Sequence, residues 1–245
     1  MDDWLRVRVA HASLVAEGVR EFVLEPLGEA RLRTWRAGAH VRLRAQTMLG
    51  QPAERRYSLV ASAQGMQGCA IAVHRAHDHG VAANLHDCVK PGDTLAISQP
   101  SNDFAQHQGP QRAVLIAGGI GITPILPMAY EMSAAGRDFE LHYAARSYGA
   151  MAYRAEAEAL RPGAVHLYLG DERQRLDIRQ LVARLLGDEH VYVWGPPSMI
   201  DEVRDAADKA ALPSRQVHFE SFGQRVAVGD RSFAVELRRS GRTLA

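Results

Sequence analysis

Three short segments of this 245-residue chain combine residue types that could bind a phosphate group or a flat heterocycle. The first, Ala117-Gly118-Gly119-Ile120-Gly121-Ile122-Thr123-Pro124, stands between an apolar run and a helical pattern. Glycine lets a ligand approach the backbone closely, and free N–H groups at a helix start favour phosphate. The segment has neither the Gly-x-Gly-x-x-Gly fingerprint nor the Gly-Lys-Ser/Thr ending of a phosphate loop. It indicates a dinucleotide site or, alternatively, a tight turn that binds nothing.

The second segment, Arg55-Arg56-Tyr57-Ser58-Leu59, places cationic, aromatic and hydroxyl side chains next to one another. A guanidinium can hold a phosphate through two hydrogen bonds, and a tyrosine ring can lie against a flat heterocycle. A hydroxyl can hydrogen-bond a ring nitrogen. The alternative is an edge strand with outward arginines and a half-buried tyrosine.

The third segment is Trp194-Gly195-Pro196-Pro197-Ser198-Met199-Ile200, which follows another apolar run. If that run lies in the same sheet as the first glycine loop, both loops can line one crevice, because ligands bind at the carboxyl ends of parallel strands. Taken alone, the segment could equally be an ordinary turn into a helix.

The elements that must position these segments change in character near residue 105. Before it, short alternating runs separated by turns predict an antiparallel barrel or sandwich, with one helix at Ala82–Cys88. Residues Ser101–Arg112 are polar and indicate a linker. After it, strands alternate with helices, which predicts a parallel sheet that begins at Ala113–Ala117.

Helix starts in this second half carry capping signals. Thr123 is expected to cap a helix with Pro124 at its first position, and Asp177 to cap the segment from Ile178 to Leu186. Ser198 with Asp201 is expected to open a helix that runs to about Leu212, and a further helix is expected over Met151–Arg161.

Composition excludes several classes of protein. The 29 basic and 28 acidic residues give a formal net charge of +1, which argues against nucleic acid as the main partner. No apolar run is long enough for a bilayer, and the N-terminal residues fit no targeting peptide. Two cysteines, Cys69 and Cys88, are too few for a disulfide scaffold or a Cys-ligated cluster. A cytoplasmic protein without a membrane partner is expected.

In this order and spacing, the three motifs resemble those of the ferredoxin–NADP reductase superfamily. The chain is most similar to the phthalate dioxygenase reductase type, the reductase components of Rieske oxygenases. Supporting stretches are Ala37-Gly38-Ala39-His40-Val41, Ile71-Ala72-Val73-His74-Arg75 and His218-Phe219-Glu220-Ser221-Phe222-Gly223. The resemblance covers residues 4 to 245.

The resemblance implies a fold class of β plus α/β, in three parts. Residues 1–105 would form an antiparallel flavin-binding β-barrel, and residues 106–223 a parallel-sheet α/β domain that binds NAD(P)H. Residues 224–245 would be a linker and the first hairpin of a plant-type [2Fe-2S] domain. Because no cysteine follows, the cluster is expected in a full-length form and not in this chain, and truncation is favoured over natural absence.

The resemblance also implies roles for individual residues. Ser58, Glu220 and Phe222 would be catalytic, with Ser58 near the flavin nitrogen that accepts the hydride, and Glu220 and Phe222 closing over the nicotinamide. Arg56 would contact the flavin phosphate and Tyr57 would pack against the flavin. The other expected flavin contacts are Leu59, Ala72, Val73, His74, His79, Gly80, Val81 and Ala82. The expected nucleotide contacts are Gly118, Gly119, Gly121, Thr123, Arg146, Ser147, Trp194, Gly195, Pro196 and Met199, together with Phe222.

The implied function is transfer of a hydride from NADH to bound FMN, then of single electrons to a [2Fe-2S] centre and a terminal oxygenase partner. FAD is the less favoured flavin, and NADPH stays open because Arg146 and Ser147 could tolerate its extra phosphate. A monomer is expected. Two alternatives are a free-standing NAD(P)H:flavin reductase or diaphorase, and a flavin-binding regulatory module without catalysis.

Three positions depart from the family pattern. His79 and Ala82 replace an arginine and a serine that would contact the flavin phosphate, and Trp194 replaces a cysteine near the nicotinamide. The run His74-x-x-His77-x-His79 suggests a metal, but a polar loop next to the flavin with its imidazoles in solvent is the favoured interpretation, so no metal is expected.

Overall fold

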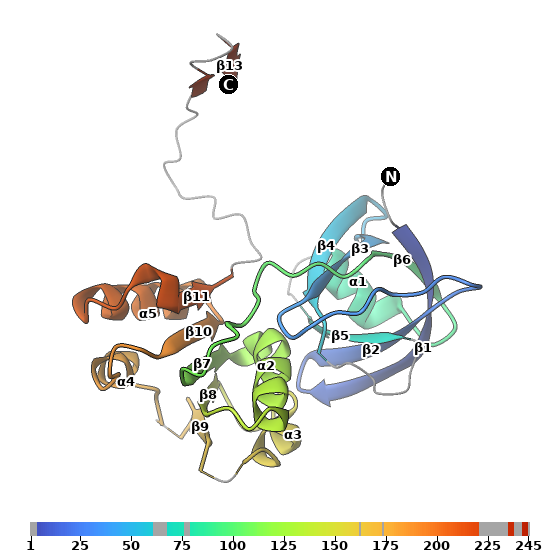
Figure 1. Ribbon diagram of the computed structural model, residues 1–245. Coiled ribbons are helices and arrows are strands. Elements are labelled where there is room, and N and C mark those ends of the chain that lie inside the picture. The colour runs from blue at the N-terminus through green and yellow to red at the C-terminus, as the bar shows by residue number, and fades with distance from the viewer. Residues whose placement is uncertain are drawn as a thin grey trace.

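The computed structural model describes residues 4–60, 68–75, 79–161, 163–172, 174–220, 235–237 and 242–244 (Figure 1). The strands are β1 (Trp4–Ala16), β2 (Val19–Pro26), β3 (His40–Gln46), β4 (Pro52–Ser58), β5 (Cys69–His74), β6 (Thr94–Ser98), β7 (Ala113–Gly118), β8 (Phe139–Ala145), β9 (Val165–Leu169), β10 (His190–Trp194), β11 (Val217–Phe219), β12 (Val235–Leu237) and β13 (Arg242–Leu244). The helices are α1 (Val81–Cys88), α2 (Ile122–Ala134), α3 (Arg154–Glu158), α4 (Ile178–Ala183) and α5 (Pro197–Lys209).

The first six strands form one antiparallel sheet in the order β4-β3-β6-β1-β2-β5. The two edges of this sheet meet just after β4, where Leu59 bridges to Ile71 and the Val60 N–H donates to the Ala70 carbonyl over 3.0 Å. Alternating strand residues such as Val7 and Val9 point into a common apolar core. The sheet thus closes into the expected antiparallel barrel, and closure leaves few edges unpaired.

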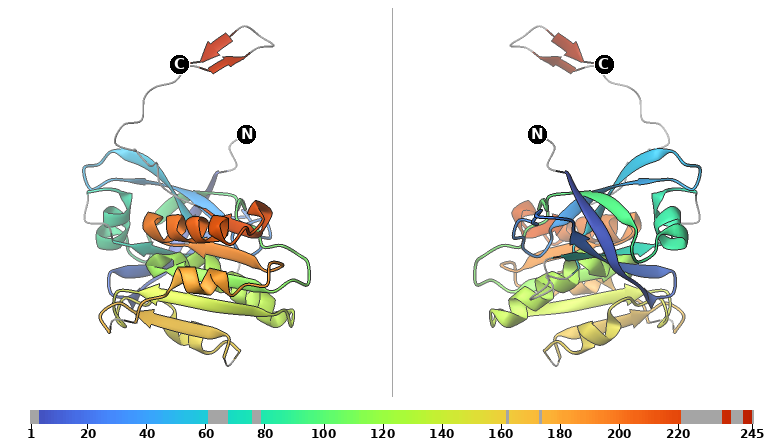
Figure 2. Two further views of the ribbon diagram at one scale, coloured as in Figure 1. Left: turned by 90° about the vertical axis from the view of Figure 1, so that its left-hand side faces the viewer. Right: turned by 90° about the vertical axis from the view of Figure 1, so that its right-hand side faces the viewer.

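The second half of the described chain forms a parallel sheet in the order β11-β10-β7-β8-β9. Figure 2 shows α4 and α5 on one face of this sheet and α2 on the other. Strand β7 alternates accordingly, with Leu115 in the core beneath α2 and with Val114 and Ile116 in the core beneath α4 and α5. Burial on both faces explains why the sequence of β7 is continuously apolar.

The strand order reverses at β7. From it the chain adds β8 and β9 on one side, then crosses over to add β10 and β11 on the other. The loops after β7 and β10 therefore leave the sheet beside each other and diverge to opposite faces. In open α/β sheets this switch point is where ligands bind.

Several helix ends differ from the sequence-based predictions. Helix α2 begins at Ile122 after a 3₁₀ turn, so Thr123 lies inside it and its Oγ1 donates to the Ile120 carbonyl over 3.0 Å instead of capping. Helix α5 begins at Pro197 without a side-chain cap from Ser198. The expected helix over Met151–Arg161 shortens to α3, because Tyr153 has a positive φ of 56°. Asp177 caps α4 as expected, by accepting from the Gln180 N–H over 2.9 Å.

Helix α2 joins the barrel to the parallel sheet. The Glu131 carboxylate accepts the Ala37 N–H of the barrel over 2.7 Å and the Gln106 amide of the linker over 2.6 Å. On the opposite side of the junction, the Tyr153 hydroxyl donates to Glu21 of β2 over 2.7 Å. Buried Phe104 and Met128 belong to a core cluster that includes residues of both halves. These contacts fix how the two sheets sit relative to each other.

The linker is held to the sheet edge by a histidine cluster. The rings of His107 and His190 stack at 3.8 Å, His190 Nδ1 lies 2.8 Å from His218 Nε2, and His218 stacks on Tyr192 at 4.3 Å. Burial, followed by the neighbouring histidines, lowers the pKa of His218 to about 4, and burial with His190 and Arg137 does the same for His107. Both rings are thus neutral at pH 7.

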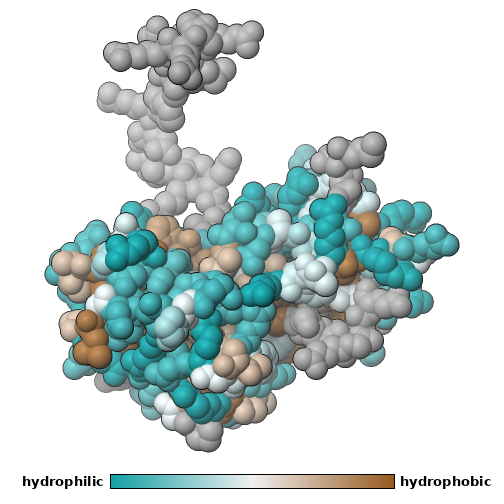
Figure 3. All heavy atoms as spheres, viewed as in Figure 1, coloured by the Kyte–Doolittle hydropathy of each residue, from teal (hydrophilic) through white to brown (hydrophobic). Residues whose placement is uncertain are grey.

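The face of the molecule in Figure 3 is mainly hydrophilic, with hydrophobic residues in small separate groups. Within the part of the chain that the structure describes, no helix is both long and apolar enough to cross a membrane.

We predict that Glu131→Ala lowers the free energy of unfolding by about 1–3 kcal/mol, because it leaves a buried N–H and a buried amide without their acceptor. Urea unfolding followed by circular dichroism measures the change. Glu202→Ala, which removes an exposed carboxylate paired with Arg179 at 3.9 Å, is the control and should stay within about 0.5 kcal/mol of the parent. Equal losses in both variants would contradict the assigned role of Glu131.

The histidine cluster predicts acid-sensitive stability. A histidine whose folded pKa lies below the unfolded value of 6.5 stabilises the fold fully above pH 6.5, and this contribution is lost as pH falls from 6.5 through about 4. The melting temperature should therefore decrease over this range. His218→Phe keeps a ring against Tyr192 but cannot be protonated, so its melting temperature should decrease less steeply as pH falls. If the melting temperature of this variant depends on pH as steeply as that of the parent, His218 is not the source of the acid sensitivity.

Candidate functional site

The loops that follow β7 and β10 are in direct contact. A Cβ atom at Gly121 would overlap the carbonyl oxygen of Trp194, and one at Gly118 would collide with Pro196 and Met199. A Cβ atom at Gly195 would likewise collide with the Met199 side chain and crowd the Gly118 backbone. The strand register continues this pairing, because Trp194 lies opposite Ala117. Three of these glycines are therefore required by contact between the loops, whatever ligand lies beyond them.

Gly119 differs from the other glycines of this segment. Its φ is +55°, and a Cβ there would meet no atom within 4 Å. It therefore presents bare backbone to open space at the start of the 3₁₀ turn that leads into α2. That is the arrangement by which a glycine admits a ligand close to the main chain and to the free N–H groups of a helix start.

The register between β4 and β3 shows which side chains of the Arg55–Ser58 motif lie on each face of the sheet. Residues directly opposite each other in an antiparallel pair share a face, and Ser58 lies opposite His40. Ser58 and Arg56 thus share one face, and Arg55 and Tyr57 share the other. Ser58 is buried, at 6 % exposure. Tyr57 packs against the barrel core.

The carboxyl group of Glu220 enters this region directly after β11. Both its oxygens are buried and have no hydrogen-bond partner of good geometry among the described residues. Burial, then the negative charge of Asp103, raises the pKa of Glu220 to about 7, against the opposing effects of Arg56 and Trp194. A carboxyl group with such a pKa can hold or release a proton at neutral pH.

Glu220 belongs to a cluster built from separate segments. A ring nitrogen of His40 and a carboxylate oxygen from each of Asp103 and Glu220 lie within 4.8 Å of one another. Asp103 also forms an ion pair with Arg56 at 3.6 Å. His40 is 1 % exposed, with its Nε2 3.1 Å from the Ser101 hydroxyl. Burial, reinforced by the charge of Arg56, lowers the pKa of His40 and keeps it neutral.

The remaining residues expected at the flavin lie around the barrel. Leu59, Ala72 and Val73 are buried, and Ala72 packs in the core cluster shared with the parallel sheet. His74 and His79 are exposed. Gly80 is the N-cap residue of α1, which contains Val81 and Ala82.

The residues expected at the adenosine end lie after β8. Arg146 is exposed, and the Ser147 hydroxyl accepts the Ala150 N–H over 3.3 Å within a tight turn. They sit at the carboxyl end of β8, which flanks β7 on the side away from β10.

The structure thus brings Ser58 and Glu220 to one region and the glycine loops to the sheet switch point. Phe222 and His77 lie outside the described residues. Sequence reasoning did not reveal that His40 and Asp103 lie beside Glu220, or that Arg55 and Arg56 occupy opposite faces of β4. Strand alternation could have distinguished Arg55 from Arg56, whereas only the fold brings Asp103 of the linker to Glu220.

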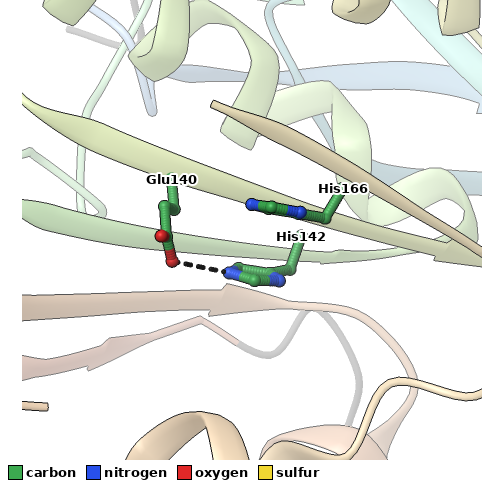
Figure 4. A group of neighbouring side chains, drawn as sticks. All are labelled: Glu140, His142 and His166. Carbon is green, nitrogen blue, oxygen red and sulfur yellow. Dashed lines mark hydrogen bonds and ion pairs between the residues drawn. The ribbon is translucent and has the colours of Figure 1, made fainter. Parts of the chain in front are cut away.

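Figure 4 shows a second group of this kind, formed by Glu140, His142 and His166. A carboxylate oxygen and one ring nitrogen from each histidine lie within 4.8 Å of one another. Arg112 and Arg184 both pair with Glu140. The two imidazole rings stack with an interplanar angle of 13°, so their in-plane lone pairs do not converge on one point. A divalent cation would meet two guanidinium groups and poorly directed ligands. The group therefore reads as a buried charge and hydrogen-bond network of β8 and β9.

Comparisons with known proteins agree with this geometry. The family model for the oxidoreductase NAD-binding domain matches residues 115–205. The chain is 37 % identical over 246 residues to the heme-dependent oxidative N-demethylase beta subunit of Ectopseudomonas mendocina (strain ymp), covering 100 % of this chain and 77 % of that protein. It is 33 % identical to the carnitine monooxygenase reductase subunit of Escherichia coli (strain K12), covering 96 % and 74 %.

Among solved structures, the chain superposes on phthalate dioxygenase reductase with a TM-score of 0.80 and 31 % identity, covering 98 % of this chain and 75 % of that one. That structure is described as modular, for electron transfer from pyridine nucleotides to [2Fe-2S]. The chain belongs to the family of oxygenase reductase components that includes phthalate dioxygenase reductase. It is an NAD-binding oxidoreductase.

The loop contact predicts unequal effects of two neighbouring substitutions. Gly121→Ala should lower the free energy of unfolding by about 2 kcal/mol or more, because its Cβ forces the two loops apart. Gly119→Ala meets open space and should cost only about 1–2 kcal/mol, from its left-handed backbone. Urea unfolding of both variants tests this order, and a larger loss in Gly119→Ala would reverse the interpretation.

Proposed function

We propose that this chain is the flavin- and NADH-binding part of an oxygenase reductase, with FMN held by the barrel and NADH by the parallel sheet. When bound, the flavin takes a hydride from the nicotinamide and passes its electrons on singly. The observation that carries the proposal is the convergence of Ser58, Glu220 and the two glycine loops at the junction between the sheets.

The residues present fit such ligands. Gly119 offers bare backbone at a helix start, which suits the pyrophosphate of a dinucleotide. Among the described residues, neither buried oxygen of Glu220 has a hydrogen-bond partner of good geometry, so a polar ligand edge would satisfy them. Tyr57 provides a ring that packs against the barrel core, and Ser58 follows it in the chain with its hydroxyl on the opposite face of β4.

Orientation is the main contribution of the chain. Ser58 would hydrogen-bond the reactive edge of the flavin, and the loops after β7 and β10 would hold the nicotinamide against it. Fixing two reactants in this way lowers a barrier by roughly 7–11 kcal/mol in favourable cases. Glu220 would hold a proton beside them, and Phe222 would help to exclude water.

The flavin phosphate would lie by the start of α1, near His79, Gly80, Val81 and Ala82. Arg55 lies on the Tyr57 face of β4, so it is better placed for this phosphate than Arg56, the residue first expected there. Because His79 and Ala82 contribute no fixed positive charge, Arg55 would carry more of the phosphate affinity. Leu59, Ala72, Val73 and His74 would border the flavin ring.

At the nucleotide, Gly118, Gly121 and Gly195 would keep the loop backbones together while Thr123, Pro196 and Met199 shape the crevice. Trp194 would lie near the nicotinamide. Arg146 and Ser147 would approach the adenosine ribose, which leaves NADPH as a second donor beside NADH.

The expected partners follow from the relatives, which include reductase subunits of oxygenase systems. We propose a terminal oxygenase as the electron acceptor, reached through a [2Fe-2S] centre. The backbone of β12 and β13 pairs antiparallel, as in the hairpin expected to begin such a domain. The domain limits at 105 and 223, the monomeric state and the cytoplasmic location stay predictions.

The test is the visible spectrum of the purified protein with FMN, before and after anaerobic addition of NADH. A flavin spectrum that bleaches supports the proposal. Failure to bind flavin would contradict it, and bound flavin that NADH leaves oxidised would favour a binding module without catalysis. Flavin that is lost in gel filtration yet reduced in turnover would favour a free-standing flavin reductase.

Within this reaction, Ser58→Ala should slow reduction of the bound flavin at least tenfold, because it removes the hydrogen bond that orients the reactive edge. Stopped-flow absorbance measures the rate, and flavin affinity should stay within a few-fold of the parent. Thr94→Ala, on β6 of the same barrel, is a hydroxyl-deleting control expected to leave the rate unchanged. A normal rate in Ser58→Ala would remove Ser58 from the mechanism.

A further inference from the structure

Four titratable or charged side chains meet outside the barrel core, beside the junction of the two sheets. They are His40 of β3, Arg56 of β4, Asp103 of the linker and Glu220 after β11. Their closeness results entirely from the fold, because they are far apart in the sequence. Among them, Glu220 is the group whose carboxyl oxygens are buried without a well-directed partner.

Arg56 and its neighbour Arg55 lie on opposite faces of β4. Arg56 lies opposite Arg42 and shares the face of Ser58, where its NH1 is 3.6 Å from Asp103 Oδ2. Arg55 lies opposite Leu43, a core residue of the barrel, and so shares the face of Tyr57. The two adjacent arginine side chains therefore leave β4 on opposite faces.

We propose that Arg56 and Asp103 are positioning residues that act as opposed charges on the Glu220 carboxyl, and that Arg56 does this instead of binding the flavin phosphate. The proposal deepens the proposed function and rests on it only in placing Glu220 beside the nicotinamide.

The surroundings of Glu220 are consistent with opposite effects of Asp103 and Arg56 on its carboxyl group. Asp103 is 62 % exposed and Arg56 is 50 % exposed, so water screens their effects, but the Glu220 oxygens are buried and feel them more strongly than a surface group would. His40 faces the same cluster and is neutral, because burial and Arg56 lower its pKa. Trp194, from β10, adds a weaker stabilisation of the carboxylate.

The ion pair between Arg56 and Asp103 makes the two effects depend on each other. Removing Arg56 takes away a positive charge and also leaves the Asp103 charge uncompensated, and both changes favour protonated Glu220. Removing the Asp103 charge takes away a repulsion and frees Arg56 to approach the carboxylate, and both changes favour ionised Glu220. The two substitutions should therefore act in opposite directions.

The test is a pH titration by carbon-13 NMR of protein labelled at the glutamate carboxyl carbons, with Glu220→Gln identifying the Glu220 signal. The parent should titrate near pH 7, the value to which burial and Asp103 raise the Glu220 pKa. Arg56→Gln should move the midpoint up by roughly half a unit to one unit, and Asp103→Asn should move it down by a similar amount. The double variant should titrate close to the parent.

Flavin binding separates the proposal from the alternative role of Arg56. FMN carries a phosphate and riboflavin does not, so their affinities report on phosphate contacts. Arg55→Gln should weaken FMN binding about tenfold and spare riboflavin, whereas Arg56→Gln should change neither by more than about threefold. Arg179→Gln, at an exposed side chain of α4, is the surface control.

Midpoints that do not move, or that move in the same direction, would overturn the proposal, as would a selective loss of FMN affinity in Arg56→Gln. The titration needs neither flavin nor NADH. Failure of NADH to reduce the parent would therefore contradict the proposed function and leave this result intact.

Discussion

The whole site depends on the contact between the two loops that follow β7 and β10. Gly118, Gly121 and Gly195 allow these loops to touch, and a single Cβ at Gly121 would displace the backbone of Trp194. This contact sets the place where α2 begins, and with it the direction in which the free N–H groups of the helix start point. The same helix holds the barrel through Glu131, so the loop contact also helps to fix where the barrel stands relative to the parallel sheet.

Helix α2 therefore has two functions in one rigid element. Its first turn belongs to the nucleotide loop, and its third turn carries the carboxylate that accepts hydrogen bonds from the barrel and the linker. A rigid connection of this kind suits a reaction in which two ligands held by different sheets must meet face to face. The bond between Tyr153 and Glu21 closes the opposite side of the junction.

Much of the architecture could be predicted because it depends on local periodicity. Alternating runs give the barrel strands, and the continuous apolar run Ala113–Ala117 gives the central parallel strand, as the structure confirms. Helix starts were less predictable, since Thr123 satisfies its hydroxyl on the Ile120 carbonyl inside a 3₁₀ turn. The sequence also did not reveal why Gly118, Gly121 and Gly195 must be glycines, because the reason is a contact between loops that are over seventy residues apart. Asp103 could not have been connected with Glu220 for the same reason: a polar linker residue has no pattern that identifies its distant neighbour.

Strand β11 is three residues long and lies at the edge of the sheet, where β10 is the strand that pairs with it among the described residues. Glu220 follows it immediately, so the side of the chain on which its carboxyl emerges depends on the register Val191–Val217, Tyr192–His218 and Val193–Phe219. Side chains alternate along a strand, and a slip of one residue exchanges the two faces. During divergence, a one-residue deletion in the turn before β11 would therefore leave the glycine motifs and the parallel sheet recognisable while turning the acid away. The length of that turn therefore decides on which side of the chain the acid emerges, which the glycine motifs do not.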